Sequence, residues 1–203
     1  MTLYEFNPSR STRVRWLLQE LDLEFDAVRI DLMAGEHKRA EFLRINPAGK
    51  VPVLVDGPMV LTETMAIVLY LAECDLQQRF LPADSAGKAQ VYRWLSFAVT
   101  ELEQPLWRIR RHTKLYAAER RLPAEIELAR EDFAVMARVL EAHMHEGPFV
   151  TGANISIADF VLAWTLDWAS THDLLEHNPN LLAYLERMYR RPAAPPRIRG
   201  ART

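Results

Sequence analysis

Sequence patterns typical of β-strands occur only in the first 62 residues of the chain. Residues 2–6 are rich in β-prone side chains, residues 25–32 alternate apolar and charged side chains, and residues 51–55 form a β-branched run. The Asp56-Gly57 pair is a hairpin signal, and residues 59–61 supply the strand that returns from it. A small sheet is therefore expected near the N-terminus, with no strand beyond it.

Helix patterns alternate with these strands. Val14, Leu17 and Leu18 recur with helical spacing, and the polar stretch 34–44 carries a weaker helical periodicity. Thr62 is expected to cap a third helix, which runs from Glu63 to about Cys74 and is apolar on every side near its middle. The resulting order is βαβαββα. One side of that last helix can cover the sheet, and its other side requires a second layer.

Beyond this region the apolar residues keep only helical spacing. Pro105 is expected to kink one helix, and Pro123 suits the first turn of another. Residues 156–168 form a nearly all-apolar helix, which should lie at the centre of a bundle. The second part of the chain is therefore expected to be all-helical.

The patterns divide the chain into two domains. The first is expected over residues 1–80, a linker over 81–87, and the all-helical domain over 88–203. From about residue 192 we expect a flexible tail, because prolines interrupt any helix and the arginines there have no acidic neighbours. The basic residues of this C-terminal region are Arg190, Arg191, Arg197, Arg199 and Arg202.

Charge and cysteine content exclude several classes of function. The formal net charge is −2, which gives no general attraction to nucleic acid or to an anionic membrane. Cys74 is the only cysteine, so neither an internal disulfide nor a cysteine-based zinc cluster can form, and no metal is expected. The first residues lack the features of a secretory signal, and no apolar run is long enough to span a bilayer. We expect a cytoplasmic protein.

Four short motifs lie in order along the chain. They are Asn7-Pro8-Ser9-Arg10-Ser11, Asn46 to Leu54 (NPAGKVPVL), Leu61 to Ile67 (LTETMAI) and Ser156-Ile157-Ala158-Asp159. In sequence, order and spacing they resemble the cytosolic glutathione transferase family, and its bacterial, serine-type members in particular. The resemblance implies an α/β thioredoxin-like domain (βαβαββα, with a mixed four-stranded sheet), followed by an all-α helical bundle. It also implies that the Ser-Ile-Ala-Asp motif is a capping box that serves folding.

The NPAGKVPVL motif implies a peptide-binding edge. A proline at the start of a buried strand cannot donate a backbone hydrogen bond to the sheet. If the Val51-Pro52 bond is cis, the N–H and C=O of Val51 turn outward and can pair with an extended peptide as a strand edge does. The resemblance implies that this peptide is glutathione, which serves as a co-substrate, and that its cysteinyl backbone makes the pair.

The remaining glutathione contacts follow from charge and from the resemblance. Glu63 and Thr64 lie at a helix start, where free N–H groups favour an anion. We expect Thr64 to bind the γ-glutamyl carboxylate and Glu63 its ammonium group. By the same resemblance, His37 and Lys38 reach the glycyl carboxylate, and Lys50 contacts the peptide. Each of these three cations is also compatible with a solvated surface position.

The chemistry requires that the glutathione thiol loses its proton near neutral pH. Only about 3% of a thiol with a pKa near 8.5 is ionised at pH 7, and one hydrogen bond to the thiolate is worth about 1.5–3 kcal/mol. Ser9 aligns with the serine of serine-type transferases, whereas Ser11 is nearer the helix and is expected to be its N-cap. Three stabilisers of the thiolate stay open: Ser9, Ser11 and Arg10. No cysteine lies in this loop, which argues against glutaredoxin-like thiol transfer through an enzyme cysteine.

The resemblance implies an enzyme that conjugates glutathione to hydrophobic, electrophilic small molecules, as in detoxification. A homodimer is expected because two-fold dimers are the commonest oligomers and the usual state of this family. The alternative is a non-catalytic glutathione-transferase-like protein with a binding or regulatory role. The intact loop serine and the Glu63-Thr64 pair favour the enzyme.

Overall fold

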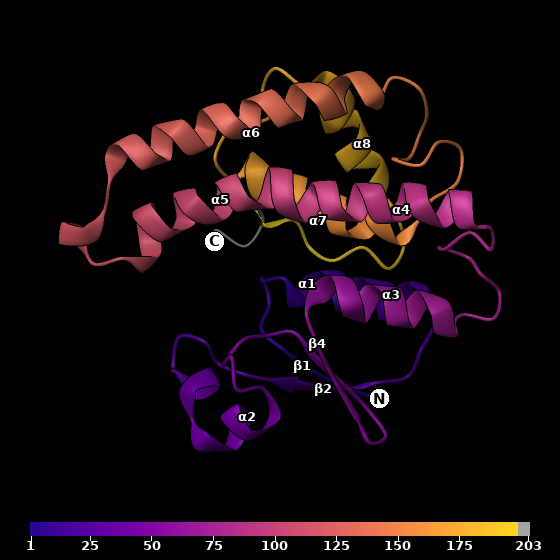
Figure 1. The fold of residues 1–203 in the computed structure, drawn as a ribbon, viewed down its shortest axis with the longest axis vertical. Coiled ribbons are helices and arrows are strands. Elements are labelled where there is room, and N and C mark those ends of the chain that lie inside the picture. Colours follow the sequence, from indigo (N-terminus) through magenta and orange to yellow (C-terminus); the bar gives the residue numbers. More distant parts are fainter. Residues whose placement is uncertain (199–203) are drawn as a thin grey trace. The chain divides into compact units, whose positions relative to one another are not determined.

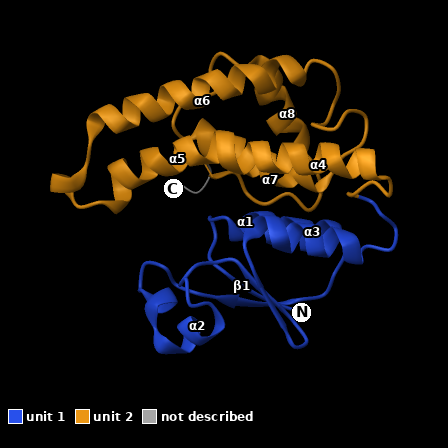
Figure 2. Cartoon of the chain, viewed as in Figure 1, with its two compact units in different colours: residues 1–79 blue, residues 80–203 orange. Residues whose placement is uncertain are grey.

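A computed structural model describes residues 1–198 of the chain. The chain divides into two compact units, the first from Met1 to Arg79 and the second from Phe80 onward (Figure 2). All four strands lie in the first unit, and helices joined by loops make up the described part of the second unit (Figure 1). The expected α/β domain followed by an all-helical domain is thus confirmed.

The first unit is built on a mixed four-stranded sheet with the order β2-β1-β3-β4. Its strands are β1 (Thr2–Glu5), β2 (Asp26–Arg29), β3 (Val53–Asp56) and β4 (Met59–Thr62). β1 runs parallel to β2 and antiparallel to β3, and β3 runs antiparallel to β4. The βαβαββα order expected from the sequence is therefore correct.

Helices cover both faces of this sheet (Figure 1). α1 (Ser11–Glu20) and α3 (Thr64–Cys74) contact each other on one face, and α2 (Ala40–Ile45) lies on the other. Successive side chains of a strand point to opposite faces, so Leu3 and its neighbour Leu54 belong to one core, and Tyr4 and Val53 belong to the other. Tyr4 packs with α2 through Phe42, with ring centroids 6.1 Å apart.

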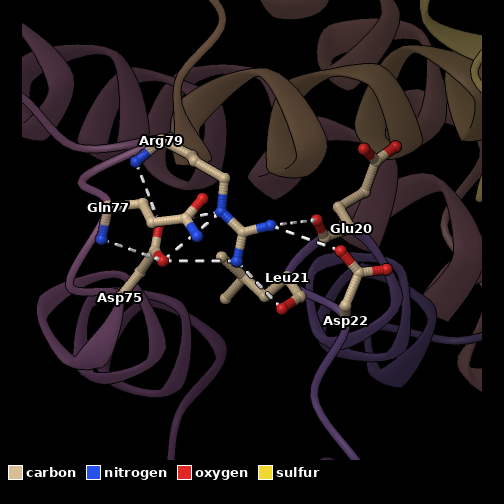
Figure 3. A network of polar contacts seen from close by, with 6 residues as sticks. All are labelled: Glu20, Leu21, Asp22, Asp75, Gln77 and Arg79. Atoms are coloured by element: carbon tan, nitrogen blue, oxygen red, sulfur yellow. Dashed lines mark hydrogen bonds and ion pairs between the residues drawn. The ribbon is translucent and has the colours of Figure 1, made fainter.

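Arg79, the last residue of the first unit, joins the C-terminal ends of two helices (Figure 3). Its guanidinium donates to the carbonyl oxygen of Leu21 at 2.9 Å, beyond the end of α1. It also pairs with Asp75, which follows α3, at 3.2 Å, and with Asp22 at 3.4 Å. An arginine is well suited to this position, because it can satisfy helix-end carbonyl groups and carboxylates with one planar group.

The second unit contains five α-helices and short π-helical turns among its described residues. The helices are α4 (Ser85–Phe97), α5 (Glu103–Arg110), α6 (Pro123–His143), α7 (Ile157–Ser170) and α8 (Pro179–Tyr189). Asp84 caps α4 by accepting from the N–H of Gly87 at 2.8 Å. The helix therefore begins inside the segment 81–87 that was expected to be a linker.

Pro105 lies in α5, directly after a π-helical turn, η2 (Ala98–Leu102). Proline lacks the N–H that would bond one turn earlier, and its ring crowds the carbonyl group four residues before it. The expected disturbance of the helix at Pro105 is thus present as a wider turn upstream of the proline. A second π-helical turn, η3 (Arg111–Leu115), follows α5.

α7 is the centre of the second unit, as expected, since all of its residues are buried. Its capping box is complete: the Asp159 carboxylate accepts from the N–H of Ser156 at 2.8 Å and from its hydroxyl at 3.0 Å. The same carboxylate accepts from the N–H of Val150 and the hydroxyl of Tyr184, both at 2.9 Å. In the described part of the chain, no helix is long and apolar enough to cross a membrane.

The tail after α8 is attached to α7 as far as the structure describes it. Arg197 forms an ion pair with the fully buried Asp167, and the N–H of Ile198 donates to the same carboxylate at 2.7 Å. The expectation of a flexible tail from residue 192 therefore does not hold for residues 192–198, because a buried carboxylate requires these donors. Arg199 and Arg202 lie outside the described residues.

Candidate functional site

The sheet register brings the predicted site segments together at one end of the sheet. Tyr4 near the end of β1 pairs with Val53 at the start of β3, and Val53 pairs with Thr62 at the end of β4. The loop after β1, the segment before β3 and the start of α3 therefore emerge at the same end. These three segments carry Ser9, Pro52 and Glu63, and the first and last of these residues are 54 positions apart in the sequence.

The segment before β3 contains the cis peptide bond between Val51 and Pro52 that the peptide-binding hypothesis requires. Pro52 is buried, whereas Val51 is half-buried. Within residues 1–198, the structure gives Val51 no hydrogen bond through its peptide N–H or C=O. A half-buried edge with an open donor and an open acceptor can bind the backbone of an extended ligand.

Asn46 holds this segment in place. Its side-chain N–H donates to the carbonyl of Lys50 at 2.8 Å, and its side-chain oxygen accepts from the N–H of Ala48 at 3.0 Å. Asn46 is 5% exposed, so these bonds lie in a protected environment. Sequence reasoning missed this role, although an asparagine before a proline is a common turn signal.

Gly49 is the second residue of this segment that sequence reasoning missed. Its φ is +60°, and a Cβ built on it would lie 2.9 Å from the backbone oxygen of His37. Only glycine combines this backbone conformation with so close an approach. His37 belongs to η1 (Glu36–Lys38), and this close approach places its backbone beside the segment that contains Lys50 and Val51.

The three candidate cations differ in their surroundings. Lys38 and Lys50 are exposed, and His37 is half-buried with its Nδ1 atom enclosed and lacking a hydrogen-bond partner. Either exposed lysine can pair with a carboxylate group that lies in solvent. On the His37 ring, Nε2 is the nitrogen atom that can contact such a carboxylate, because Nδ1 is enclosed. The structure thus brings His37 to the loop by its backbone and leaves the lysine side chains at the surface.

Glu63 precedes α3 and adopts a backbone conformation that is rare for a residue with a side chain, with φ +67° and ψ +121°. Such strain is found mainly at binding and catalytic sites. The side chain is exposed, and Thr64 behind it is 8% exposed at the first helical position. Thr62 was expected to cap this helix, but it is the last residue of β4, and no side chain among the described residues caps α3. The first-turn N–H groups of α3 are therefore available to an anion.

The loop between β1 and α1 places three candidate residues side by side. The Ser9 hydroxyl oxygen accepts from the N–H of Ser11 at 3.1 Å, and the two hydroxyl oxygens are also 3.1 Å apart. Ser11 was expected to be the N-cap of α1, but it is the first helical residue and is fully buried, with Arg10 before it. Ser9 therefore binds the first amide of the helix, and the residue as a whole is half-buried.

Thr12 stabilises the same loop from inside α1. Its hydroxyl donates to the side-chain oxygen of Asn7 at 2.7 Å, and its N–H donates to the carbonyl of Ser9 at 3.0 Å. Thr12 is 5% exposed. Sequence reasoning did not identify this pair, because an Asn and a Thr five residues apart have no distinctive pattern before the loop is known.

Comparison with known families gives matches to both units. Residues 1–73 match the family "Glutathione S-transferase, N-terminal domain", and residues 123–187 match "Glutathione S-transferase, C-terminal domain". Glutathione S-transferase 1 of Dianthus caryophyllus is 33% identical over 170 residues, which are 80% of this chain and 74% of the relative. Disulfide-bond oxidoreductase YfcG of Escherichia coli is 31% identical over 189 residues, which are 89% of this chain and 86% of the relative.

Solved structures agree with these matches. A glutathione transferase from Methylococcus capsulatus has a TM-score of 0.85 and 28% identity, over 95% of this chain and 94% of that one. Gtt2 from Saccharomyces cerevisiae also has a TM-score of 0.85, with 27% identity over 96% and 98% of the two chains. Both units thus have the same architecture as these proteins.

Proposed function

The chain belongs to the glutathione S-transferase family and is a transferase enzyme, and we propose that it joins the glutathione thiolate to electrophilic small molecules. The observation that carries this proposal is the convergence of three segments at one end of the sheet, where each offers a different kind of contact. Val51 offers an open peptide edge, the start of α3 offers free N–H groups, and Ser9 offers a hydroxyl.

Glutathione fits these contacts along its length. The cysteinyl backbone pairs with the N–H and C=O of Val51, which have no hydrogen-bond partner within residues 1–198. The γ-glutamyl carboxylate binds at Thr64 and the first turn of α3, and its ammonium group binds Glu63. The glycyl carboxylate lies toward the cations His37, Lys38 and Lys50.

Ser9 is the preferred stabiliser of the thiolate. Ser9 is a half-buried residue beside the N-terminus of α1, whereas Ser11 is fully buried and cannot touch a ligand without moving. One hydrogen bond to an anion, worth about 1.5–3 kcal/mol, lowers a thiol pKa by about one to two units. Arg10 remains an assisting cation in this proposal. Hydrophobic electrophiles are the proposed acceptors, and a cytoplasmic location suits the enzyme because glutathione is abundant there.

Two measurements test this function. Isothermal calorimetry with glutathione should give saturable binding in the micromolar to millimolar range, as is plausible for a ligand of this size. A conjugation assay with several electrophiles should then give turnover that depends on Ser9. Wild-type protein that releases no heat at millimolar glutathione would remove the basis of the proposal. The enzyme names of the curated relatives argue against the alternative of a non-catalytic binding protein.

A second candidate reaction is the reduction of disulfides, which the relative named disulfide-bond oxidoreductase favours. In this reaction the bound glutathione thiolate attacks a disulfide sulfur and forms a mixed disulfide, and the leaving thiolate takes a proton from water. A second glutathione then attacks the mixed disulfide, which gives oxidised glutathione and the reduced product. No enzyme cysteine is needed, which agrees with a loop that has none. Parallel assays with a disulfide and an electrophile would rank the two reactions.

A homodimer is also proposed, by analogy with the family. Light scattering at the assay concentration should give twice the chain mass of 23.4 kDa. A value equal to the chain mass would reject the dimer.

A further inference from the structure

The hydroxyl group of Ser11 has few possible partners. Ser11 is fully buried, its oxygen accepts from the N–H of Phe6 at 3.4 Å, and it lies 3.1 Å from the Ser9 hydroxyl oxygen. These are the only hydrogen bonds of this hydroxyl within residues 1–198. A serine hydroxyl has one proton to donate and two positions at which it can accept.

The 3.1 Å separation of the two oxygens is also compatible with Ser9 donating to Ser11, so the direction of this bond is assigned from the partners that each proton can reach. A buried hydroxyl almost always donates its proton to an acceptor. The N–H of Phe6 is itself a donor, so the Ser9 oxygen is the acceptor that the Ser11 proton can reach. If Ser9 donated to Ser11 instead, the Ser11 proton would be left buried without a partner.

The Ser9 oxygen then receives two hydrogen bonds from the same residue. One comes from the Ser11 hydroxyl and the other from the Ser11 N–H, which is also 3.1 Å away. Both accepting positions of the Ser9 oxygen are filled, and its own proton is not used within this pair. Because the Ser9 side chain is half-exposed, that proton is available to a ligand.

We infer that Ser11 is a positioning residue, which reserves the Ser9 proton for the sulfur atom of bound glutathione. This inference rests on the function proposed above. A hydroxyl that accepts two bonds is a stronger donor, because hydrogen bonds in a chain polarise one another. A protonated thiol is only a weak acceptor for the Ser9 proton, and it cannot donate its own proton to the Ser9 oxygen, where no accepting position is left. The pair therefore favours the ionised thiol over the neutral one.

The test is a double-mutant cycle that measures the pKa of the bound glutathione thiol by ultraviolet titration of the thiolate. Ser9→Ala should raise this pKa by about one to two units. Ser11→Ala should raise it by roughly 0.1–0.7 unit, since cooperativity adds roughly 10–30% to a bond. In the Ser9→Ala background, Ser11→Ala should cause no further shift, because Ser11 acts only through Ser9.

Ser170→Ala is the matched control. Ser170 is 5% exposed in α7, and its hydroxyl donates to the carbonyl of Asp167 at 2.7 Å. This variant also loses one buried serine hydrogen bond, so it should lower the melting temperature without changing the thiol pKa. If Ser11→Ala yields no folded protein, Ser11→Cys keeps the volume with a weaker donor and should shift the pKa in the same direction.

The possible outcomes separate the inference from the proposed function. If Ser9→Ala shifts the pKa and Ser11→Ala does not, the inference is wrong and the proposed function stands. An equal shift from Ser11→Ala in both backgrounds also overturns it, because Ser11 would then act on the sulfur directly. If the thiol of glutathione ionises at the same pH with wild-type protein as it does free in solution, the proposed function itself fails.

Discussion

Two helices of this protein begin with an acidic residue in very different states. Asp159, in the first turn of α7, is fully buried and accepts hydrogen bonds from Ser156, Val150 and Tyr184. Glu63, directly before α3, is exposed, has a positive φ, and makes no capping bond. An acidic side chain near a helix start thus serves stability in one unit, at the third helical position, and remains open in the other, directly before the helix. A side chain whose hydrogen-bonding capacity is filled within the protein stabilises the fold, and one whose capacity is unfilled indicates where a ligand can bind.

The largest effect is expected from removing the buried, fully hydrogen-bonded carboxylate of Asp159. Asp159→Ala leaves several buried donors without an acceptor, at a cost of about 1–3 kcal/mol each, so the free energy of unfolding should fall by about 3–5 kcal/mol. Denaturant titration measures this loss. Glutathione affinity of the protein that remains folded should be unchanged, because Asp159 belongs to the second unit and not to the proposed site.

The same variant gives a pH test with a definite sign. Burial raises the pKa of Asp159, so this group contributes most to stability below its unfolded value of about 3.9, and the contribution is lost as pH rises through the folded value. The difference between wild type and Asp159→Ala should therefore be larger at pH 5 than at pH 8. A difference that grows with pH would contradict a raised pKa.

An intermediate effect is expected from removing the Ser9 hydroxyl, the proposed hydrogen-bond donor to the glutathione thiolate. Ser9→Ala should lower turnover at pH 7 by roughly ten- to a hundredfold, which corresponds to the loss of a charged hydrogen bond of about 1.5–3 kcal/mol. Glutathione affinity should change little, because the proposed peptide contacts at Val51, Glu63 and Thr64 are unaltered. Part of the rate should return at higher pH, since more thiol then ionises without help. A rate loss that is equal at every pH would argue against this role for Ser9.

The smallest effect, with opposite signs for stability and binding, is expected at Glu63. Glu63→Gly removes a side chain from a strained backbone, so the free energy of unfolding should rise by about 1 kcal/mol. Glutathione binding should weaken about tenfold, because the proposed partner of the glutathione ammonium group is lost. Glu63→Gln is the control that keeps the strain and removes only the charge. If Glu63→Gly weakened both properties, the strain would have no role in the site.

The sequence predicted the fold well because its signals are periodic. The alternation in residues 25–32, the hairpin at Asp56-Gly57 and the apolar helix 156–168 each depend on local spacing, and the structure has the expected element at each place. The sequence also named the three segments of the site. Their meeting point depends on strand order, which the resemblance supplied and local spacing did not.

The errors lie where one residue decides the geometry. Whether Ser9 or Ser11 binds the first amide of α1, and whether Thr62 or Glu63 precedes α3, depends on the turn in which each helix starts. Asn46 and the tail residue Arg197 were missed for another reason. Their partners are a carbonyl in a loop and a buried carboxylate thirty residues away, and neither is visible before the chain is folded.

Arg79 has a consequence for the order in which the protein is made. It is the last residue of the first unit, and it secures the carbonyl of Leu21, which precedes it by 58 residues (Figure 3). A ribosome releases the chain from its N-terminus, so α1 and the strands on either side of it emerge well before this arginine. Until residue 79 has emerged, the ends of α1 and α3 are not joined. The first unit is therefore completed by its final residue, at the moment when the helical unit begins to emerge.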